Sequence, residues 1–305
     1  MRRRRACSEP VASEATHGAA GEPGASANAG YALGPVAIAA GFRLAGYDEL
    51  GSTNAEAMER ARNGDPGDLW IVTRRQTAGR GRRGRVWVAP PGNLSASLLK
   101  VIELPPARGA TLGFVAGLAL DAALERLAPN LSVDIALDGA EGAGEGARRD
   151  RLLLKWPNDL MLDGGKLAGI LLEAENLGGG RTAIVIGIGV NVAHEPEGVP
   201  YKATSLASCG IGIDAEMLFA ALGESWVEAE RVWDAGRGFP AVRQAWLRRA
   251  KGLGGRVAVR LGDKVIDGFF ETLDDDGRLL VRAADGSLKQ IAAGDVHFGV
   301  AATAV

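Results

Sequence analysis

The sequence predicts an α+β fold in which helices pack on a mixed, largely antiparallel sheet, followed by a small C-terminal β-barrel of SH3-like size. Two patterns predict this fold. Before residue 252 the apolar, strand-like runs are linked mainly by hairpin turns, which argues against a doubly wound parallel sheet. From Gly255 onward, short alternating runs follow one another with tight Gly- and Asp-containing turns, the pattern of a small barrel. We therefore expect a disordered leader at 1–35, a main domain at 36–252 and a barrel domain at 253–305.

The composition is that of an ordinary globular protein, with 47% hydrophobic and 24% charged residues and a formal net charge of −2. This balance argues against a DNA-binding surface, which usually spreads basic charge over a whole face. Cys7 and Cys209 are the only cysteines, so no disulfide framework or cysteine-based metal site is expected, and a reducing cytoplasm is the expected location. No window approaches about 18 continuous apolar residues, so no membrane span is expected.

The predicted leader is rich in Ala, Gly, Ser and Pro and shows no periodicity, which indicates disorder. Order is expected to begin with a strand near Phe42, followed by a helix over 52–61. Thr53, with Glu56 three positions later, fits a capping box at the start of this helix, although Ser52 could supply the cap instead.

The other elements follow from the period of the apolar residues. Strands are expected at 42–47, 69–73, 93–101, 131–137, 152–155, 160–162, 166–173 and 182–192, and further helices at 109–127, 214–235 and 239–250. In the barrel, strands are expected at 257–261, 264–272, 279–283, 288–291 and 296–300. The Gly- and Ala-rich segment 138–149 is expected to be a flexible surface insertion.

The segment Gln76–Trp87, which we call the arginine loop, is the most unusual stretch of the chain. It holds four arginines and three glycines directly after an apolar strand, so it has no apolar face to bury. Glycine lets a backbone bend and approach a ligand closely, and arginine forks bind planar oxyanions. The pattern fits a phosphate-binding loop that closes over its ligand, and it also fits a solvated basic turn or a nucleic-acid patch.

Three further segments place polar groups at strand ends. They are Lys155-Trp-Pro-Asn-Asp159, Lys166-Leu-Ala-Gly-Ile170 and Gly187-Ile-Gly-Val-Asn191. Asp159 is the carboxylate best placed for Mg²⁺, which prefers oxygen ligands. Taken singly, each segment has an ordinary explanation: the lysines as surface cations, the glycines as packing residues and the asparagine as a turn cap.

Taken together and in this order, the arginine loop and the three segments resemble the biotin protein ligases, the biotin–[acetyl-CoA-carboxylase] ligases. Ser52-Thr-Asn54, Ala203-Thr-Ser-Leu206 and the C-terminal barrel are also similar to that family. The resemblance covers about residues 42–301 and implies a catalytic domain of the class II synthetase or biotin–lipoate ligase type. Some family members carry an N-terminal winged helix-turn-helix. Here the unpatterned leader precedes residue 42, so a monofunctional ligase that does not bind DNA is expected.

The resemblance implies a two-step reaction that uses ATP, Mg²⁺ and biotin. The biotin carboxylate attacks the α-phosphate of ATP and gives biotinyl-5′-AMP and pyrophosphate. A lysine of a biotin carboxyl carrier domain, such as that of acetyl-CoA carboxylase, then attacks the mixed anhydride and releases AMP. Arginines, lysines and Mg²⁺ suit this chemistry because they offset the repulsion between two anions. A loop that orders over the adenylate would protect it from water.

The resemblance also implies roles for residues of this sequence. Lys166 and Arg82 are the expected catalytic cations, and Asp159 is the expected Mg²⁺ ligand. The residues expected to bind biotin are Ser52, Thr53, Asn54, Gln76, Gly79, Arg80, Arg82, Lys166, Gly169 and Gly187. Those expected to bind ATP or the adenylate are Arg80, Arg82, Arg85, Trp87, Lys155, Asn158 and Asn191. One hydroxyl has a donor and two acceptor sites, so Thr53 could both cap its helix and bind biotin.

Three other interpretations stay open on the sequence. Lipoate or octanoate ligases and transferases have a similar catalytic fold and also acylate a carrier-domain lysine, but the intact arginine loop and the barrel favour biotin. A nucleic-acid-binding protein could use the arginine loop, although the charge balance weighs against it. The third interpretation is an inactive paralogue. It is disfavoured because every position of the family motifs holds the expected residue.

Overall fold

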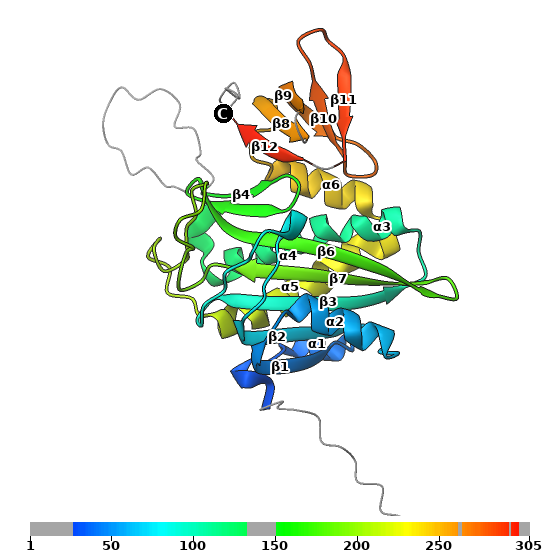
Figure 1. Ribbon diagram of the computed structural model, residues 1–305, viewed down its shortest axis with the longest axis vertical. Helices are drawn as coiled ribbons and strands as arrows, with labels where there is room; N and C mark the ends of the chain where they lie inside the picture. The colour runs from blue at the N-terminus through cyan, green and yellow to red at the C-terminus, as the bar shows by residue number, and fades with distance from the viewer. Residues whose placement is uncertain (1–26, 133–150, 262–263, 293, 299–305) are drawn as a thin grey trace, which may run out of the picture.

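The computed structural model describes residues 27–132, 151–261, 264–292 and 294–298. Its largest element is a seven-stranded sheet with the order β1-β2-β3-β7-β6-β5-β4 (Figure 1). β1 and β2 pair in parallel and the other neighbours are antiparallel, which confirms the predicted mixed, largely antiparallel sheet. The strands are β1 (Arg43–Leu50), β2 (Leu69–Gln76), β3 (Leu94–Ile102), β4 (Leu152–Lys155), β5 (Asp159–Leu162), β6 (Gly165–Gly178) and β7 (Arg181–Val190).

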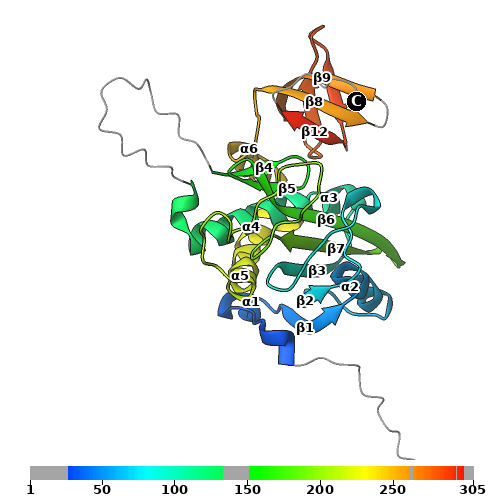
Figure 2. The same cartoon turned by 60° about the vertical axis from the view of Figure 1, so that its left-hand side comes forward.

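Helices cover both faces of this sheet (Figure 2). They are α1 (Pro35–Ala39), α2 (Thr53–Arg62), α3 (Pro106–Ala110), α4 (Leu112–Leu127), α5 (Ala215–Trp233) and α6 (Phe239–Arg248). α4 and α5 lie on one face, where Trp70 and Ile186 belong to the main core. α2 lies on the other face, over Ile71 and Val185, which belong to a second, smaller core. Because neighbouring residues of a strand point to opposite faces, the same strands supply both cores.

The apolar helix α4 is buried, as its sequence predicts. Leu112, Val115, Leu120 and Leu124 have no exposed surface. The segment Ala107–Leu127 has the length and hydropathy of a membrane-crossing helix, and 67% of its most apolar window is buried inside the structure. Packing against the sheet and α5 accounts for that composition, because a helix that is apolar all round suits the interior of a large domain.

The predicted leader is partly ordered. Residues 1–26 lie outside the described residues, but the prediction of disorder is wrong for 27–35, which form a 3₁₀ turn at Ala27–Gly30 and lead into α1. Tyr31 is 4% exposed, and its ring meets that of Phe219 edge-on with 5.5 Å between centroids. A single tyrosine in a Gly- and Ala-rich run gives no periodic signal, so only the tertiary structure reveals its partner.

The described part of the strand predicted at 131–137 is not extended. Leu131 and Ser132 belong to a 3₁₀ turn (Pro129–Ser132), and the remainder of the predicted strand lies outside the described residues, as does the predicted insertion 138–149. The other predicted strands and helices are present with shifted ends. The largest shift is in β6, which continues to Gly178 because its hairpin with β7 extends past the predicted end.

The C-terminal unit is a five-stranded antiparallel sheet with the order β11-β10-β9-β8-β12, and it lies beyond α6 in both views (Figures 1 and 2). Its strands are β8 (Arg256–Leu261), β9 (Lys264–Leu273), β10 (Leu279–Arg282), β11 (Leu288–Ile291) and β12 (Asp295–Phe298), which confirms the five predicted strands. Val259, Phe270 and Val281 form its buried side. The domain limits at 36 and 252 stay predictions.

Candidate active site

A pocket lies between the large sheet and the arginine loop, and most of the residues singled out in the sequence meet there. Those that line it are Ser52, Thr53, Asn54, Gln76, Arg80, Arg82, Arg85, Trp87, Asn158, Asp159, Lys166, Gly169 and Gly187. Residues of the lining that carried no assigned role are Gly81, Arg83, Val86, Ser95, Ile170, Leu171, Ile188, Gly189 and Tyr201. Segments more than a hundred residues apart thus share one cavity because α2, β3, β5, β6 and β7 meet around it.

The start of α2 divides its two hydroxyls between capping and the pocket. Ser52 Oγ accepts a hydrogen bond from the Ala55 amide at 3.4 Å, so Ser52 is the N-cap and the expected Thr53 cap is wrong. Thr53 instead donates from its amide (2.9 Å) and from its hydroxyl (3.1 Å) to Gln76 Oε1. This leaves the Gln76 amide nitrogen for other partners. A Cβ at Gly79 would lie 2.5 Å from that nitrogen, so a glycine there keeps the side chain in place.

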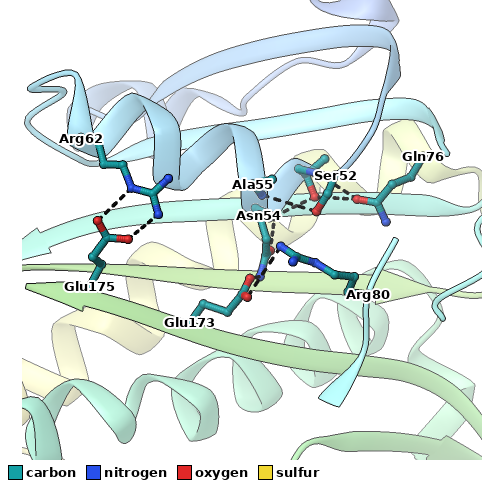
Figure 3. A network of polar contacts seen from close by, with 10 residues as sticks. Ser52, Asn54, Ala55, Arg62, Gln76, Arg80, Glu173 and Glu175 are labelled. Carbon is teal, nitrogen blue, oxygen red and sulfur yellow. Dashed lines mark hydrogen bonds and ion pairs between the residues drawn. The ribbon is translucent and has the colours of Figure 1, made fainter. Parts of the chain in front are cut away.

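Behind these groups runs a buried polar network (Figure 3). Ser97 of β3 donates from its hydroxyl to Asn54 Oδ1 at 2.6 Å, and Ser97 Oγ also lies 2.7 Å from Thr53 Oγ1. Asn54 Nδ2 donates to Glu173 Oε2 at 2.7 Å. The other oxygen of Glu173 lies 3.8 Å from the Arg80 guanidinium. The network therefore links the start of α2 to the arginine loop through a carboxylate of β6.

The arginine loop folds back on itself over the pocket. The Gly81 amide donates to the Arg85 carbonyl oxygen at 2.7 Å, and the Trp87 amide donates to the Gly79 carbonyl oxygen at 2.9 Å. Arg83 has φ of +56°, a left-handed conformation that costs a residue with a side chain some free energy. Arginine and glycine cannot form a core, so these backbone bonds give the loop its shape.

Arg82 connects the arginine loop to the strand pair β5–β6. Its guanidinium donates to Asn158 Oδ1 at 3.1 Å. Asn158 is itself fixed, because its Nδ2 donates to the Ile170 carbonyl oxygen at 2.7 Å and its own carbonyl accepts from the Ile170 amide at 2.8 Å. Arg82 and Asn158 are 76 positions apart in the sequence, so it is the fold that brings them into contact.

Lys166 is the best-defined cation of the pocket. Its Nζ lies 2.7 Å from Asp159 Oδ1, and the side chains are 19% and 17% exposed. The same nitrogen lies 5.7 Å from the ring centroid of Trp87 and 5.5 Å from that of Tyr201, both within the range of a cation–π contact. An ammonium held among a carboxylate and two rings has a fixed position, which an electrostatic catalyst needs.

Glycines form part of the pocket lining, among them Gly169 and Gly187, which the family resemblance assigned to biotin. A Cβ at Gly187 would lie 2.2 Å from Asn54 Oδ1, and one at Gly169 would lie 3.2 Å from the Trp87 ring. Gly189 is closer still, with 2.4 Å from an added Cβ to the ring of Trp87. The indole thus rests directly on a floor without side chains.

Sequence reasoning missed two serines of β3. Ser97 carries the network described above, and Ser95 lines the pocket. Ser95 is 3% exposed, and its hydroxyl has no hydrogen-bond partner among the described residues. Two hydroxyls at positions i and i+2 of an apolar strand share one face, and this was the available signal. Glu173 and Tyr201 carried no comparable signal, and Gly189 lies within the segment Gly187–Asn191 but had no role of its own.

Three expected site residues lie outside the lining. Gly79 is a buried residue of the arginine loop, and its carbonyl oxygen accepts from the Trp87 amide. Lys155 ends β4, opposite Asp159 in the strand register. Asn191 is 1% exposed, and its Nδ2 donates to the backbone carbonyls of Lys166 and Thr204.

The charges of the pocket suit an anionic ligand. Of the described residues that line it, Arg80, Arg82, Arg83, Arg85 and Lys166 are the cations, and Asp159 is the one carboxylate. Among the described residues, no group of three or more His, Cys, Asp or Glu side chains could hold a metal ion.

Known protein families match both units of the chain. Residues 52–191 match the biotin/lipoate A/B protein ligase family, and residues 252–299 match the biotin protein ligase C-terminal domain.

Several curated proteins are similar over most of their length. A biotin–[acetyl-CoA-carboxylase] ligase of Paracoccus denitrificans is 38% identical over 254 residues, which cover 81% of this chain and 97% of that protein. A ligase of the same name from Mycobacterium tuberculosis is 34% identical, with 81% and 86% covered. A bifunctional ligase/repressor of Escherichia coli is 32% identical, with 81% and 71% covered.

Solved structures show the same architecture. The biotin protein ligase of Aquifex aeolicus in complex with biotin and ATP superimposes with a TM-score of 0.65 at 25% identity, covering 84% of this chain and 99% of that one. The ligase of Leishmania major in complex with biotinyl-5-AMP gives a TM-score of 0.51 at 25% identity, with 83% and 98% covered. The sequence identity to full-length ligases, together with the shared fold, shows that this chain belongs to the biotin protein ligase family.

Proposed function

We propose that this chain is an ATP-dependent biotin protein ligase that joins biotin to a lysine of a biotin carboxyl carrier domain. The observation that carries the proposal is the meeting of Arg82 and Lys166, from the arginine loop and from β6, in one pocket with the Thr53–Gln76 pair. Cations suit the carboxylate of biotin and the phosphates of ATP, and the amide and hydroxyl groups suit the uncharged ureido ring. The relatives crystallised with biotin and ATP, or with biotinyl-5-AMP, support these ligands.

In the first step, a carboxylate oxygen of biotin forms a bond to the α-phosphorus of ATP. The bond from that phosphorus to the bridging oxygen breaks, and pyrophosphate leaves with the electron pair. Lys166 and Arg82 offset the repulsion between the two anions and the charge that grows at phosphorus. Asp159, 2.7 Å from Lys166 Nζ, holds the ammonium in place.

In the second step, the ε-amine of the carrier lysine attacks the carbonyl carbon of the mixed anhydride. The amide bond forms, the bond between the acyl carbon and the AMP oxygen breaks, and the amine loses a proton to solvent. The arginine loop keeps water from the anhydride in the interval, since it lies across the pocket through the Arg82–Asn158 hydrogen bond.

We assign Mg²⁺ to a site shared between the protein and ATP. Asp159 fits such a site, because Mg²⁺ is usually held by one or two carboxylates together with substrate phosphates. When bound, the ion would neutralise phosphate charge in the first step. The pairing of Asp159 with Lys166 means that ion and ammonium would share one carboxylate.

The remaining assignments divide the pocket into two parts. Thr53, Asn54 and Gln76 are proposed to bind the ring end of biotin, with the Ser52 cap and Gly187 shaping their surroundings. For the adenylate the proposed residues are Arg80, Arg82, Arg85, Trp87 and Asn158, and Gly169 is proposed to face biotin; all of them line the pocket. Lys155 and Asn191 are also proposed to serve the nucleotide, although neither is in the lining of the pocket.

The carrier of acetyl-CoA carboxylase is the proposed acceptor, and the cytoplasm is the proposed location. The acceptor follows from the names of the relatives from Paracoccus and Mycobacterium. The location follows from the low cysteine content, because Cys7 and Cys209 are the only cysteines of the chain.

A carrier acylation assay tests the proposal. Purified protein is incubated with ATP, Mg²⁺, a biotin carrier domain and either biotin or lipoate, and the carrier is analysed by mass spectrometry. We expect one biotin on one carrier lysine and no lipoyl product. Lipoylation without biotinylation would instead make the chain a lipoate ligase. The family that matches residues 52–191 is named for both biotin and lipoate ligases.

A further inference from the structure

Glu173 of β6 reaches two other elements, the helix α2 and the arginine loop (Figure 3). Its Oε2 accepts a hydrogen bond from Asn54 Nδ2 at 2.7 Å. Its Oε1 lies 3.8 Å from Nη2 of Arg80, which makes the two side chains an ion pair. Glu173 is not among the described residues that line the pocket. One carboxylate therefore joins the start of α2 to the arginine loop from a position beside the pocket.

The alternation of β6 explains why Glu173 faces α2. Glu173 pairs with Val185 and Glu175 with Ala183, and both partners belong to the smaller core under α2. Glu175 accepts two hydrogen bonds from Arg62 of α2, at 2.8 and 2.5 Å. The two glutamate side chains are each 36% exposed. They share a strand, a face and an exposure, but only Glu173 of the two is paired with the arginine loop.

The carboxylate also fixes the orientation of the Asn54 amide. An ionised carboxylate accepts hydrogen bonds and cannot donate, so the Nδ2 of Asn54 has to face Glu173. The Oδ1 of Asn54 then faces Ser97, whose hydroxyl donates to it at 2.6 Å. Asn54 is 6% exposed and lies against Gly187, where an added Cβ would be 2.2 Å from Oδ1. Because Asn54 lines the pocket, Glu173 helps to set which groups the pocket presents.

The polar network begins and ends in the arginine loop. Gln76, the first residue of the loop, is joined to Asn54 through the hydroxyls of Thr53 and Ser97. Glu173 continues the network from Asn54 back to the loop. The loop is therefore attached to the body of the domain at its start and again a few residues later.

The second attachment is weak, which suits a loop that has to open. The Arg80 side chain is 53% exposed, and 3.8 Å exceeds the length of a hydrogen bond. Ion pairs of this kind contribute little free energy and are screened by salt. A loop held in this way can cover a reactive intermediate and still release the products of the reaction.

We propose that Glu173 is a positioning residue for the arginine loop: its carboxylate holds Arg80, and with it the loop, across the pocket while it orients the Asn54 amide. The inference rests on the proposed ligase reaction, in which the loop shields the adenylate. Without the negative charge at Glu173 the loop should open more often, and biotinyl-5′-AMP should escape from the pocket faster.

The first test is limited trypsin cleavage of the full chain without any ligand. Cleavage at the arginines of 81–85 is measured relative to cleavage after Lys289 for wild type, Glu173→Gln, Arg80→Gln and the double variant. Glutamine keeps an oxygen that accepts from Asn54 and removes the charge that faces Arg80. We expect Glu173→Gln to speed cleavage by about two- to five-fold, the range of a partly exposed ion pair. In the Arg80→Gln background the same change should have no further effect, because the pair is already broken.

Salt distinguishes the loss of an ion pair from a loss of packing. Between about 0.1 and 1 M salt the Debye length falls from about 10 to about 3 Å. Cleavage of the wild-type loop should therefore approach that of Glu173→Gln as the salt concentration rises, while Glu173→Gln itself responds less. Escape of labelled biotinyl-5′-AMP, measured with an excess of unlabelled biotin and without a carrier domain, should be about two- to five-fold faster in Glu173→Gln.

Glu175→Gln is the matched control. It removes an equally exposed carboxylate from the same face of β6, but the arginine that loses its partner, Arg62, belongs to α2. We expect this change to leave cleavage of the arginine loop and escape of the adenylate at their wild-type rates.

Three outcomes would overturn the inference: unchanged cleavage in Glu173→Gln, an equal increase in Glu175→Gln, or an increase that persists in the Arg80→Gln background. If Glu173→Gln does not fold, Arg80→Gln tests the same pair by cleavage and salt dependence, because its side chain is half exposed. A wild-type protein that forms no biotinyl-5′-AMP would instead contradict the proposed function. Cleavage without ligand would still decide the role of Glu173, so the two failures are distinguishable.

Discussion

The indole nitrogen of Trp156 donates a hydrogen bond to the carbonyl oxygen of Gly277 at 3.0 Å, and this bond joins the C-terminal sheet to the segment that carries Asn158 and Asp159. Trp156 is 2% exposed. Gly277 has φ of +79° and lies so close to Phe114 that an added Cβ would approach its ring to 2.5 Å. The turn between β9 and β10 therefore docks beside the nucleotide end of the proposed site.

We expect Trp156→Phe to lower the free energy of unfolding by about 1–3 kcal/mol, because it leaves the buried Gly277 carbonyl without a donor. It should also slow adenylate formation several-fold, since Asn158 and Asp159 follow directly in the chain. Urea unfolding and single-turnover kinetics measure the two effects. Trp226→Phe is the control: it removes the hydrogen bond from a buried indole to Glu230 within α5. A rate loss as large in the control would mean that Trp156 has no special link to the site.

The close approach of Gly189 to Trp87 predicts the effect of one added methyl group. An alanine Cβ would lie 2.4–2.6 Å from three atoms of the indole, so Gly189→Ala should displace Trp87 from the floor of the pocket. The ring lies on a loop and can move, so we expect little change in melting temperature but about a ten-fold slower adenylate step. Gly212→Ala is the control, because nothing lies within 4 Å of its added Cβ. Equal rates for both variants would contradict a ligand-positioning role for Trp87.

The arginine loop should be protected from trypsin when both substrates are bound. Arg80, Arg83 and Arg85 are exposed, and the backbone around them is held by few hydrogen bonds. If the loop orders over biotin and ATP, cleavage within 76–85 should slow markedly when both are present. Cleavage at Lys289, on an exposed strand of the C-terminal sheet, serves as the internal control. Cleavage of the arginine loop at the same rate with and without the two substrates would contradict its closure over them.

Arg151 and Asp163 predict a pH effect on stability. Arg151 donates two hydrogen bonds to the Asp163 carboxylate, at 2.9 and 2.6 Å, and these bonds hold the pKa of that carboxyl below its usual range. A carboxyl whose pKa is lower in the folded state stabilises the fold above its unfolded pKa, about 3.9, and loses this contribution as the pH falls further.

We therefore expect Arg151→Ala to lower the free energy of unfolding by about 0.5 kcal/mol near neutral pH, a small value because the pair is partly exposed. The difference from wild type should shrink as the pH falls below about 4 and the carboxyl becomes protonated. Urea unfolding of both proteins across this range is the measurement. A difference that grows on acidification would contradict the assignment.

The sequence by itself determined the elements and the kind of site. Alternation and Gly–Asp turns predicted the five strands of the C-terminal sheet, because a half-exposed strand needs a period of two and a tight turn needs those residues. The arginine loop was recognisable as a ligand-binding segment because Arg and Gly cannot be buried together. The resemblance to the biotin protein ligases pointed to Lys166 and Arg82, and both line the pocket.

Only the tertiary structure decided which polar groups meet. Asn54 binds Glu173 across 119 positions, and Asn191 donates to the backbone carbonyl of Lys166 across 25 positions. Tyr31 packs against Phe219 of α5, a contact that no local sequence pattern predicts. Periodicity reports which face of an element is buried, but the partner of a buried polar group depends on strand order and register. Those are fixed only when the whole sheet assembles.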